Sequence, residues 1–321
     1  MGLGADWHAD TLQKGRSPVN PVVLQGIFFG LMAATLQSLC YVFSRIFVTK
    51  PGNTSGLLFA LSHTQMGIAA VVAAPILLTA GLPDSTRFFW PLMGAAFFYL
   101  AGQVALFRAL RSTEASRVSP LLGLKILILA VITSLALGGT VSELQWVAVG
   151  LSVLAAFTLN YSGGSIPLPA VGAVLFCCVG YSLSDLSIRA LVLSLDSVGP
   201  FRAVLLACAM SYVVTGVVGA GLLPTCGRAT RAQWKAALPV SVTWLMAMVC
   251  LFATFRLVGV VFGNIVQSTR GVLSILMGVL IARLGHLHLE STVPASVFWR
   301  RVAAAAMMTA AVAMYVLGLP E

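Results

Sequence analysis

The 321-residue chain contains 59% hydrophobic and 9% charged residues, and its mean hydropathy is +0.98. Charged residues make up about a quarter of an ordinary globular protein, so this composition excludes a soluble domain and indicates an integral membrane protein. The formal net charge is +10, but no basic run is longer than a pair such as Arg300-Arg301. We therefore expect the lipid bilayer, and no nucleic acid, as a partner.

Residues 1–20 form a polar N-terminal tail, in which no short apolar run precedes a small-residue cleavage site, so no cleavable signal peptide is expected. Apolar segments long enough to cross a bilayer follow, separated by short Gly, Pro and charged segments. We predict an all-α integral membrane fold with ten transmembrane helices. The predicted spans are residues 21–48, 55–80, 88–109, 116–138, 144–161, 168–193, 200–223, 236–256, 260–283 and 297–319.

The fourth predicted span contains a lysine, Lys125, with apolar residues on both sides. It lies about nine residues, or roughly 13 Å of helix rise, from the nearer polar end of the span. A lone lysine at the centre of a bilayer costs on the order of 2.5–3.5 kcal/mol on insertion scales. Lys125 should therefore face the interior of a helix bundle or a water-filled cavity, where it has a group to bind.

The sequence repeats with a shift of 145 positions, which places Lys125 on Arg270 in the ninth span. With a shift of 144, Ser38, Tyr41 and Arg45 match Ser182, Asp185 and Arg189. Five spans in each copy would make the copies cross the membrane in opposite directions, as in many secondary transporters. We predict two inverted five-helix repeats, at residues 21–163 and 164–321.

Polar and aromatic side chains recur at helical spacing in the same spans as the two cations or beside them. Amides and hydroxyls are costly against lipid, so these helix faces should point inward. They could bind a substrate, or they could join helices through hydrogen bonds. The candidate substrate-binding residues are Lys125, Arg270, Gln267, Asn264, Tyr99, Gln103, Gln37, Tyr41, Tyr181 and Trp244.

Two titratable residues are candidates for coupling to protons. Asp185 is the one clear acid inside a predicted span, but Arg189 follows it by four residues, so a structural pair within the helix is an equally good interpretation. His63 is the second candidate, although an isolated histidine is more often a packing residue. The six cysteines lack CxxC spacing and lie almost all in apolar spans, and the histidine pair His286 and His288 lacks a third ligand, so no metal site is expected.

Two glycine pairs, Gly26 with Gly30 and Gly259 with Gly263, have the GxxxG spacing that marks close contacts between membrane helices. No Ser-His-Asp set, metal cluster or phosphate-binding glycine loop is visible, so we expect neither an enzyme nor a cofactor.

The segment FRALRSTEASRVSPLLGLKILILAVITSLALGGTVSELQW, with Ser119-Pro120 in the fourth span and Gln145-Trp146 opening the fifth, resembles the EamA-domain type of the drug/metabolite transporter superfamily. The resemblance extends over residues 21–319, with Gly139-Thr140 where that family often has an acid. It implies a ten-helix bundle that moves a small metabolite by alternating access. The family usually keeps both termini inside, whereas the basic residues of the predicted loops favour the opposite orientation.

A narrower similarity is to the sugar-phosphate translocators of plastids, which hold phosphate with basic residues on the fourth and ninth helices. Lys125 and Arg270 occupy these helices. The first hypothesis is therefore a secondary transporter that could act as an exchanger, whose paired cations bind the anionic group of a small anionic or zwitterionic metabolite. The alternative is a proton-coupled exporter of neutral or zwitterionic amino acids. The compact loops suit a bacterial inner membrane, with the protein as a monomer or homodimer.

Overall fold

The computed structural model describes residues 20–80, 86–112, 122, 124–136, 142–160, 168–270, 273 and 295–318. The regular elements of these residues are helices, and each of the ten predicted spans overlaps one of the α-helices. These helices are α1 (Pro21–Val48), α2 (Ser55–Leu77), α3 (Phe89–Ser112), α5 (Leu124–Ala136), α6 (Glu143–Asn160), α7 (Leu168–Ser194), α8 (Pro200–Leu222), α9 (Arg231–Val258), α10 (Val260–Ser268) and α12 (Ala295–Leu317). The short 3₁₀ helices are η1 (Leu78–Ala80), η2 (Thr86–Phe88), η3 (Asp196–Val198) and η4 (Leu223–Cys226).

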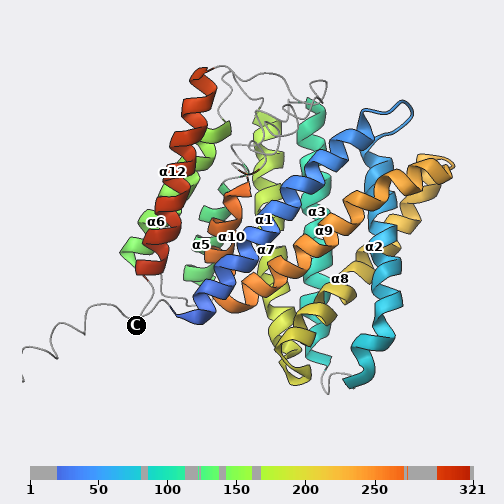
Figure 1. Cartoon of the computed structure of the whole chain (residues 1–321), viewed down its shortest axis with the longest axis horizontal. Helices are drawn as coiled ribbons and strands as arrows, with labels where there is room; N and C mark the ends of the chain where they lie inside the picture. The colour runs from blue at the N-terminus through green and yellow to red at the C-terminus, as the bar shows by residue number, and fades with distance from the viewer. Residues whose placement is uncertain are drawn as a thin grey trace, which may run out of the picture.

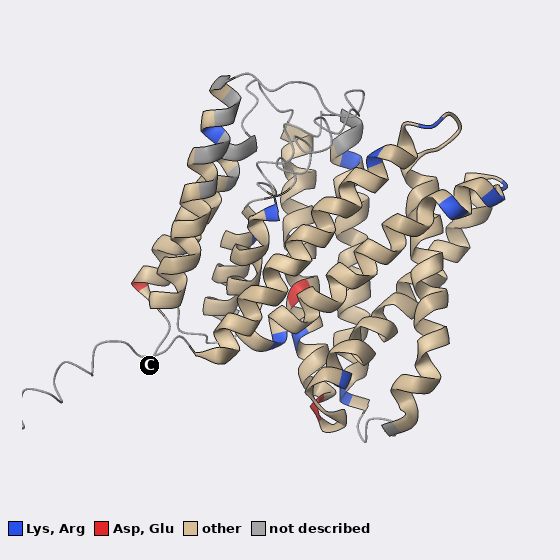
Figure 2. Cartoon of the chain, in the orientation of Figure 1, with Lys and Arg blue, Asp and Glu red and all other residues tan. Residues whose placement is uncertain are grey.

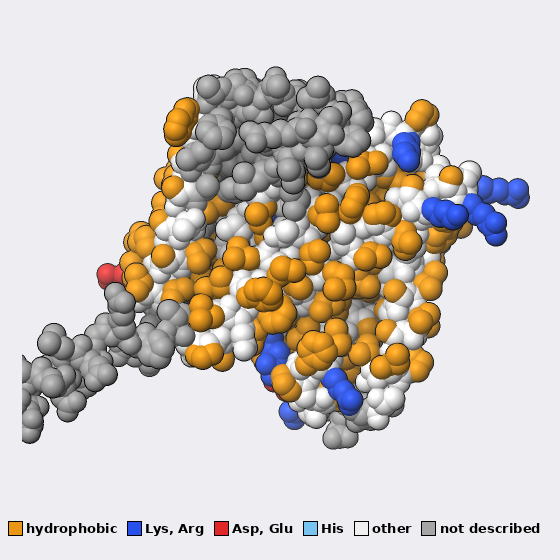
Figure 3. All heavy atoms as spheres, viewed as in Figure 1, with side chains coloured by type: hydrophobic (Ala, Val, Ile, Leu, Met, Phe, Trp, Pro, Cys, Tyr) orange, Lys and Arg blue, Asp and Glu red, His pale blue; other side chains and the backbone are white. Residues whose placement is uncertain are grey.

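Within these ranges, the six helices α1, α2, α3, α7, α8 and α9 are long and apolar enough to cross a membrane. The described parts of α5, α6 and α12 contain shorter apolar helices. The outer surface agrees with this composition, because hydrophobic side chains cover much of the face shown in Figure 3 while Lys and Arg gather near its edges. The protein is thus an all-α integral membrane protein, as predicted.

Local capping explains where several helices begin. Thr54 accepts a hydrogen bond from the Leu57 amide at the start of α2. At the start of α9, Thr230 and Gln233 form a reciprocal capping box. Such a box satisfies amides that have no partner inside the helix. It starts α9 at Arg231, five residues before the predicted start of this span, because the cap stabilises a polar first turn that hydropathy does not detect.

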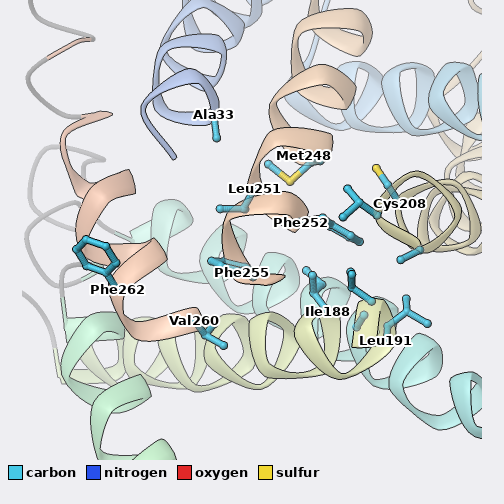
Figure 4. Close-up of a cluster of buried hydrophobic side chains, with 14 of the residues drawn as sticks. Ala33, Ile188, Leu191, Cys208, Met248, Leu251, Phe252, Phe255, Val260 and Phe262 are labelled. Carbon is cyan, nitrogen blue, oxygen red and sulfur yellow. The ribbon is translucent and has the colours of Figure 1, made fainter. Parts of the chain in front are cut away.

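Helices that are distant in the sequence pack in pairs. α1 packs against α9, α2 against α8, α3 against α7, and α6 against α12 (Figure 1). α10 contacts α1, α5, α7 and α9, which places it near the centre of this arrangement. The largest buried apolar cluster joins side chains of α1, α7, α8, α9 and α10, including Ala33, Ile188, Phe252 and Phe262 (Figure 4).

The glycine pairs have different roles. A methyl group on Gly30 would lie 2.7 Å from the Val266 side chain, so the predicted close contact at this glycine is present. Gly259 was predicted as a contact glycine, and this is wrong: no atom lies within 4 Å of the position of its missing Cβ. Gly259 instead lies between the end of α9 and the start of α10, with a φ of +79°. Glycine adopts this backbone conformation without the steric cost that other residues have.

A close backbone contact between α2 and α8 gives a testable expectation. A Cβ on Gly216 of α8 would lie 2.6 Å from the Cα of Gly67 on α2, whereas Gly221, on the same helix, has open space around it. Overpacking of this kind typically costs 1–3 kcal/mol, so we expect Gly216→Val to destabilise the protein by about 2 kcal/mol or more. Thermal unfolding in detergent, with Gly221→Val as the matched control within about 0.5 kcal/mol of wild type, measures the difference. Equal stability of the two variants would contradict the α2–α8 packing.

Candidate functional site

Charged residues are sparse and lie mostly towards the two ends of the bundle (Figure 2). The mid-span cations predicted from the sequence, Lys125 and Arg270, are exceptions that the helices place in polar surroundings. Lys125 lies near the start of α5, and Arg270 follows the last residue of α10 by two positions. Both residues are partly buried.

Lys125 has an acidic partner in the bundle. Its Nζ lies 2.6 Å from Oδ2 of Asp185 on α7. The same oxygen accepts a hydrogen bond of 2.7 Å from the Asn264 side chain on α10. Asp185 is only 6% exposed, so α5, α7 and α10 meet at one buried carboxylate. A buried acid held by a cation and an amide avoids most of the cost of an isolated charge in an apolar medium.

The predicted pairing of Asp185 with Arg189 is wrong. Arg189 lies four residues further along α7 and is exposed, whereas the carboxylate forms its ion pair with Lys125. A pair on the surface of one helix contributes only a few tenths of a kcal/mol. An unpaired lysine inside a membrane span costs more free energy than such a surface pair contributes. The pair of Asp185 with Lys125 is therefore favoured over a pair with Arg189.

Arg270 has a different environment. Its Nη1 donates a hydrogen bond of 2.7 Å to Oε1 of Gln37, and its guanidinium lies 5.5 Å from the centre of the Tyr41 ring. Both partners belong to α1 and are uncharged. Gln37 is buried, whereas Tyr41 is 45% exposed. Among the described residues, Arg270 therefore has a hydrogen-bond partner and an aromatic neighbour but no partner of opposite charge.

The two cations are held in the same way by equivalent serines. The Ser38 hydroxyl of α1 shares its one hydrogen between the Ala34 carbonyl at 2.8 Å and the Arg270 carbonyl at 3.1 Å. The Ser182 hydroxyl of α7 shares its hydrogen between the Cys178 carbonyl at 2.7 Å and the Lys125 carbonyl at 3.4 Å. Ser38 and Ser182 are 144 positions apart, and Lys125 and Arg270 are 145 apart. The repeat seen in the sequence therefore corresponds to a repeated contact in space, a role for the serines that the sequence analysis did not assign.

An aromatic ring lies beside each of the two cations. The Lys125 ammonium lies 5.8 Å from the centre of the Tyr181 ring, a cation–π arrangement like that of Arg270 over Tyr41. Tyr181 is stacked on Tyr99 of α3 with ring centroids 6.2 Å apart. We call the set Lys125, Asp185, Asn264, Tyr181, Tyr41, Gln37 and Arg270 the central cluster.

Beside the central cluster lies a partly buried hydrogen-bonded chain of side chains. The Gln103 amide donates to the Tyr99 hydroxyl at 3.1 Å, and this hydroxyl lies 3.1 Å from His63 Nε2. His63 Nδ1 lies 2.9 Å from the Phe59 carbonyl. A carbonyl only accepts hydrogen bonds, so Nδ1 carries a hydrogen. When the ring is neutral, Nε2 then accepts a hydrogen bond from the Tyr99 hydroxyl. The structure therefore places His63 in a packed chain with Tyr99 and Gln103.

The remaining predicted residues lie close to these groups. Gln267 is buried on α10, one turn before Arg270. Trp244 of α9 donates a hydrogen bond of 2.7 Å to the Tyr212 hydroxyl, and the Tyr212 ring lies 6.4 Å from the His63 ring. Tyr212 was missed by the sequence analysis because a single tyrosine in an apolar span has no spacing signal. Ser274, which shares the helix face of Arg270 in the sequence, lies outside the described residues.

Two grooves lie away from these residues. One, of about 330 Å³, runs between α3 and α7 and is lined by residues that include Ala101, Arg108 and Phe176. The other, of about 190 Å³, is lined by apolar side chains of α2, η2 and α8, such as Ala74, Phe88 and Met210. Neither contains a member of the central cluster, so the case for the central cluster rests on its charges and contacts.

Comparison with known proteins identifies the fold and its class. Residues 24–161 match the EamA-like transporter family. A segment of 134 residues is 31% identical to an "uncharacterized transporter in cobO 3'region" of Sinorhizobium sp, and covers 94% of that protein and 41% of this chain. The chain belongs to the EamA-like transporter family. A crystal structure of a protein with 16% identity matches 94% of this chain and 98% of its own with a TM-score of 0.68, a likeness that shows the fold.

The resemblance found from the sequence is thereby confirmed, and the protein is a membrane transporter of the EamA type. The match to residues 24–161 contains Lys125 and Tyr99, but not Asp185, Tyr181 or Arg270. Family membership alone therefore assigns no role to the central cluster, and its chemistry has to be argued from the contacts described above.

Proposed function

We propose that this EamA-type protein is a secondary active transporter that moves a small anionic or zwitterionic metabolite by alternating access, with Arg270 binding the anionic group. The observation that carries the proposal is a mid-span guanidinium whose described partners, Gln37 and Tyr41, are both uncharged. Guanidinium groups bind carboxylates, sulfonates and phosphates through two parallel hydrogen bonds. The exposed side of Tyr41 gives this position an open flank.

We further propose that residues 21–163 and 164–321 act as two inverted repeats. The family match to residues 24–161 covers nearly all of the first repeat and none of the second. The two repeats pack against each other through the pairs α1 with α9 and α3 with α7. Each cation is also bound across this division: Lys125 by α7, and Arg270 by α1. Rocking one repeat against the other would then change both cation environments together, as alternating access requires.

Lys125 is the second proposed contact for the anionic group, although it is paired with Asp185. Its ammonium has three donor hydrogens, and its side chain is 19% exposed, so it can bind an anion while keeping the carboxylate. The other predicted members, Gln267, Asn264, Tyr99, Gln103, Tyr181 and Trp244, would shape the site around this group.

The cluster also favours exchange over net transport. With Lys125 neutralised by Asp185, the described residues of an empty cluster leave one uncompensated positive charge at Arg270. Moving such a charge through an apolar region is costly, so the empty protein should reorient slowly and the loaded protein rapidly. We expect the protein to exchange one anion for another across the membrane.

A ligand screen tests the proposed substrate class. The purified protein is heated with phosphorylated, sulfonated, carboxylated and cationic metabolites, and its unfolding temperature is recorded. A ligand that binds only the folded protein at about a hundred times its Kd adds roughly 2.7 kcal/mol to stability. We expect anions to stabilise the protein. Stabilisation by cationic compounds alone would contradict the proposal.

The alternative function is a proton-coupled exporter of neutral or zwitterionic amino acids, in which Asp185 or His63 titrates. The buried carboxylate shared by Lys125 and Asn264 is the observation that favours it. It requires flux driven by a pH gradient that disappears in Asp185→Asn or in His63→Gln. Unchanged flux in both variants would remove this alternative.

The setting of the protein is proposed on similar grounds. The transporter relative comes from Sinorhizobium sp, and the predicted loops are short, so we propose a bacterial inner membrane as the location. We propose a monomer or a homodimer as the assembly, which the size of the particle in detergent would measure.

A further inference from the structure

We infer that the central cluster selects substrates carrying a single negative charge, and that Asp185 sets this selectivity. The inference rests on the proposed function, because it narrows the substrate class of the same site from anionic or zwitterionic metabolites to monovalent anions. Two features support the inference. The first is the net charge of the central cluster, and the second is the difference between the surroundings of Lys125 and those of Arg270.

The charges of the cluster add up to +1. Lys125 and Arg270 each contribute one positive charge, and Asp185 contributes one negative charge. Asp185 is also the one acid inside any predicted span. The other acidic residues of the full sequence lie in the termini or between predicted spans, at positions 6, 10, 84, 114, 143, 196, 290 and 321.

Net charge matters here because the cluster lies in the apolar interior of a helix bundle. An uncompensated charge in a medium of low dielectric constant is costly, whereas in water it is not. A monovalent anion brings the loaded cluster to neutrality. A divalent anion leaves an excess negative charge beside Asp185, and a neutral zwitterion leaves the positive charge of Arg270 uncompensated.

The two halves of the cluster show how this charge is set. Position 185 on α7 corresponds to position 41 on α1 at the shift of 144. In one half this position is an aspartate that forms an ion pair with Lys125, and in the other it is a tyrosine whose ring faces Arg270. The charge of Lys125 is thus balanced by a carboxylate of the protein, whereas the charge of Arg270 is available to a carboxylate or a similar group of the substrate.

The test uses two series of small molecules that differ mainly in charge. The first is succinamide, succinamate and succinate, and the second is dimethyl phosphate and methyl phosphate at pH 8. Their affinities for the full-length protein in nanodiscs are measured by thermal shift and titration. We expect the monovalent member to bind about ten-fold or more tightly than the divalent member, since one unbalanced charge in this setting exceeds the energy of a ten-fold change in affinity.

Three variants change the net charge in known steps. Asp185→Asn raises it to +2 and should shift the preference by about ten-fold or more towards the divalent members. The double variant Lys125→Gln/Asp185→Asn returns it to +1 and should restore the monovalent preference. Tyr41→Asp lowers it to zero by placing beside Arg270 the acid found in the other half, and should abolish binding of all anions. Because Tyr41→Asp leaves the ion pair of Lys125 with Asp185 in place, it still tests the effect of net charge if Asp185→Asn fails to fold.

The outcomes separate this inference from the function on which it rests. Equal or tighter binding of divalent anions by the wild type, or an unchanged preference in Asp185→Asn, would overturn the charge selection while leaving an anion transporter. If no anion of either series stabilises the wild type more than Arg270→Gln, the proposed function itself is overturned.

Discussion

Replacing Arg270 by glutamine is expected to weaken anion binding by about a hundred-fold. Two charge-assisted hydrogen bonds from a guanidinium to an anion contribute roughly 3 kcal/mol between them, which corresponds to a hundred-fold change in Kd. Glutamine retains a hydrogen-bond donor close to Gln37 but has neither the charge nor the fork of arginine. Titration of the purified protein with the tightest anion found in the ligand screen measures the change.

The matched control for this substitution is Arg256→Gln at the end of α9. Arg256 forms an ion pair with Asp196 of η3, with its Nη2 2.9 Å from Oδ1, and it is not a member of the central cluster. An ion pair of this exposure contributes at most about 1 kcal/mol, so anion affinity should stay within about two-fold of wild type. Equal loss of affinity in both variants would show that Arg270 acts through the general positive charge of the protein.

Replacing Asp185 by asparagine is expected to destabilise the fold by about 3 kcal/mol. The change leaves the Lys125 ammonium without its counter-charge, and breaking one side of a buried ion pair typically costs 3–5 kcal/mol. The lower end applies because the Lys125 side chain is 19% exposed. Thermal or denaturant unfolding in a fixed detergent measures the loss.

The double variant Lys125→Gln/Asp185→Asn should recover most of that stability, because it removes both charges and leaves two amides near Asn264. Neutralising both members of a buried pair is often nearly neutral for stability. The two single variants and the double variant form a cycle that isolates the pair. A double variant as unstable as the sum of the single variants would show that the Lys125–Asp185 contact does not stabilise the fold.

The all-α membrane fold could be predicted from the sequence, because the signal of its apolar segments is large. Ten apolar segments predict ten helices, and a shift of 145 positions places Lys125 on Arg270. The start of α9 was missed because a capping box between Thr230 and Gln233 extends this helix beyond its apolar part. Hydropathy measures the apolar content of a segment, whereas a helix boundary depends on local hydrogen bonds.

The partners of the charged residues could not be predicted as well. Spacing along one helix favoured Arg189 as the partner of Asp185, whereas the structure pairs Asp185 with Lys125 on another helix. Contacts between helices depend on their packing, which one sequence does not specify. The equivalence of Ser38 and Ser182 was visible in the repeat, and their shared role became clear only when both were seen to bind the carbonyls of the cations.

The most direct test of the account is counterflow in liposomes. The purified protein is reconstituted, and uptake of a labelled anion from the ligand screen is compared between liposomes loaded with the same unlabelled anion and unloaded liposomes. Alternating access through a cluster with one uncompensated charge predicts saturable uptake that is much faster into loaded liposomes and is lost in Arg270→Gln. Uptake that is equally fast into unloaded liposomes, or that is unchanged in Arg270→Gln, would contradict it.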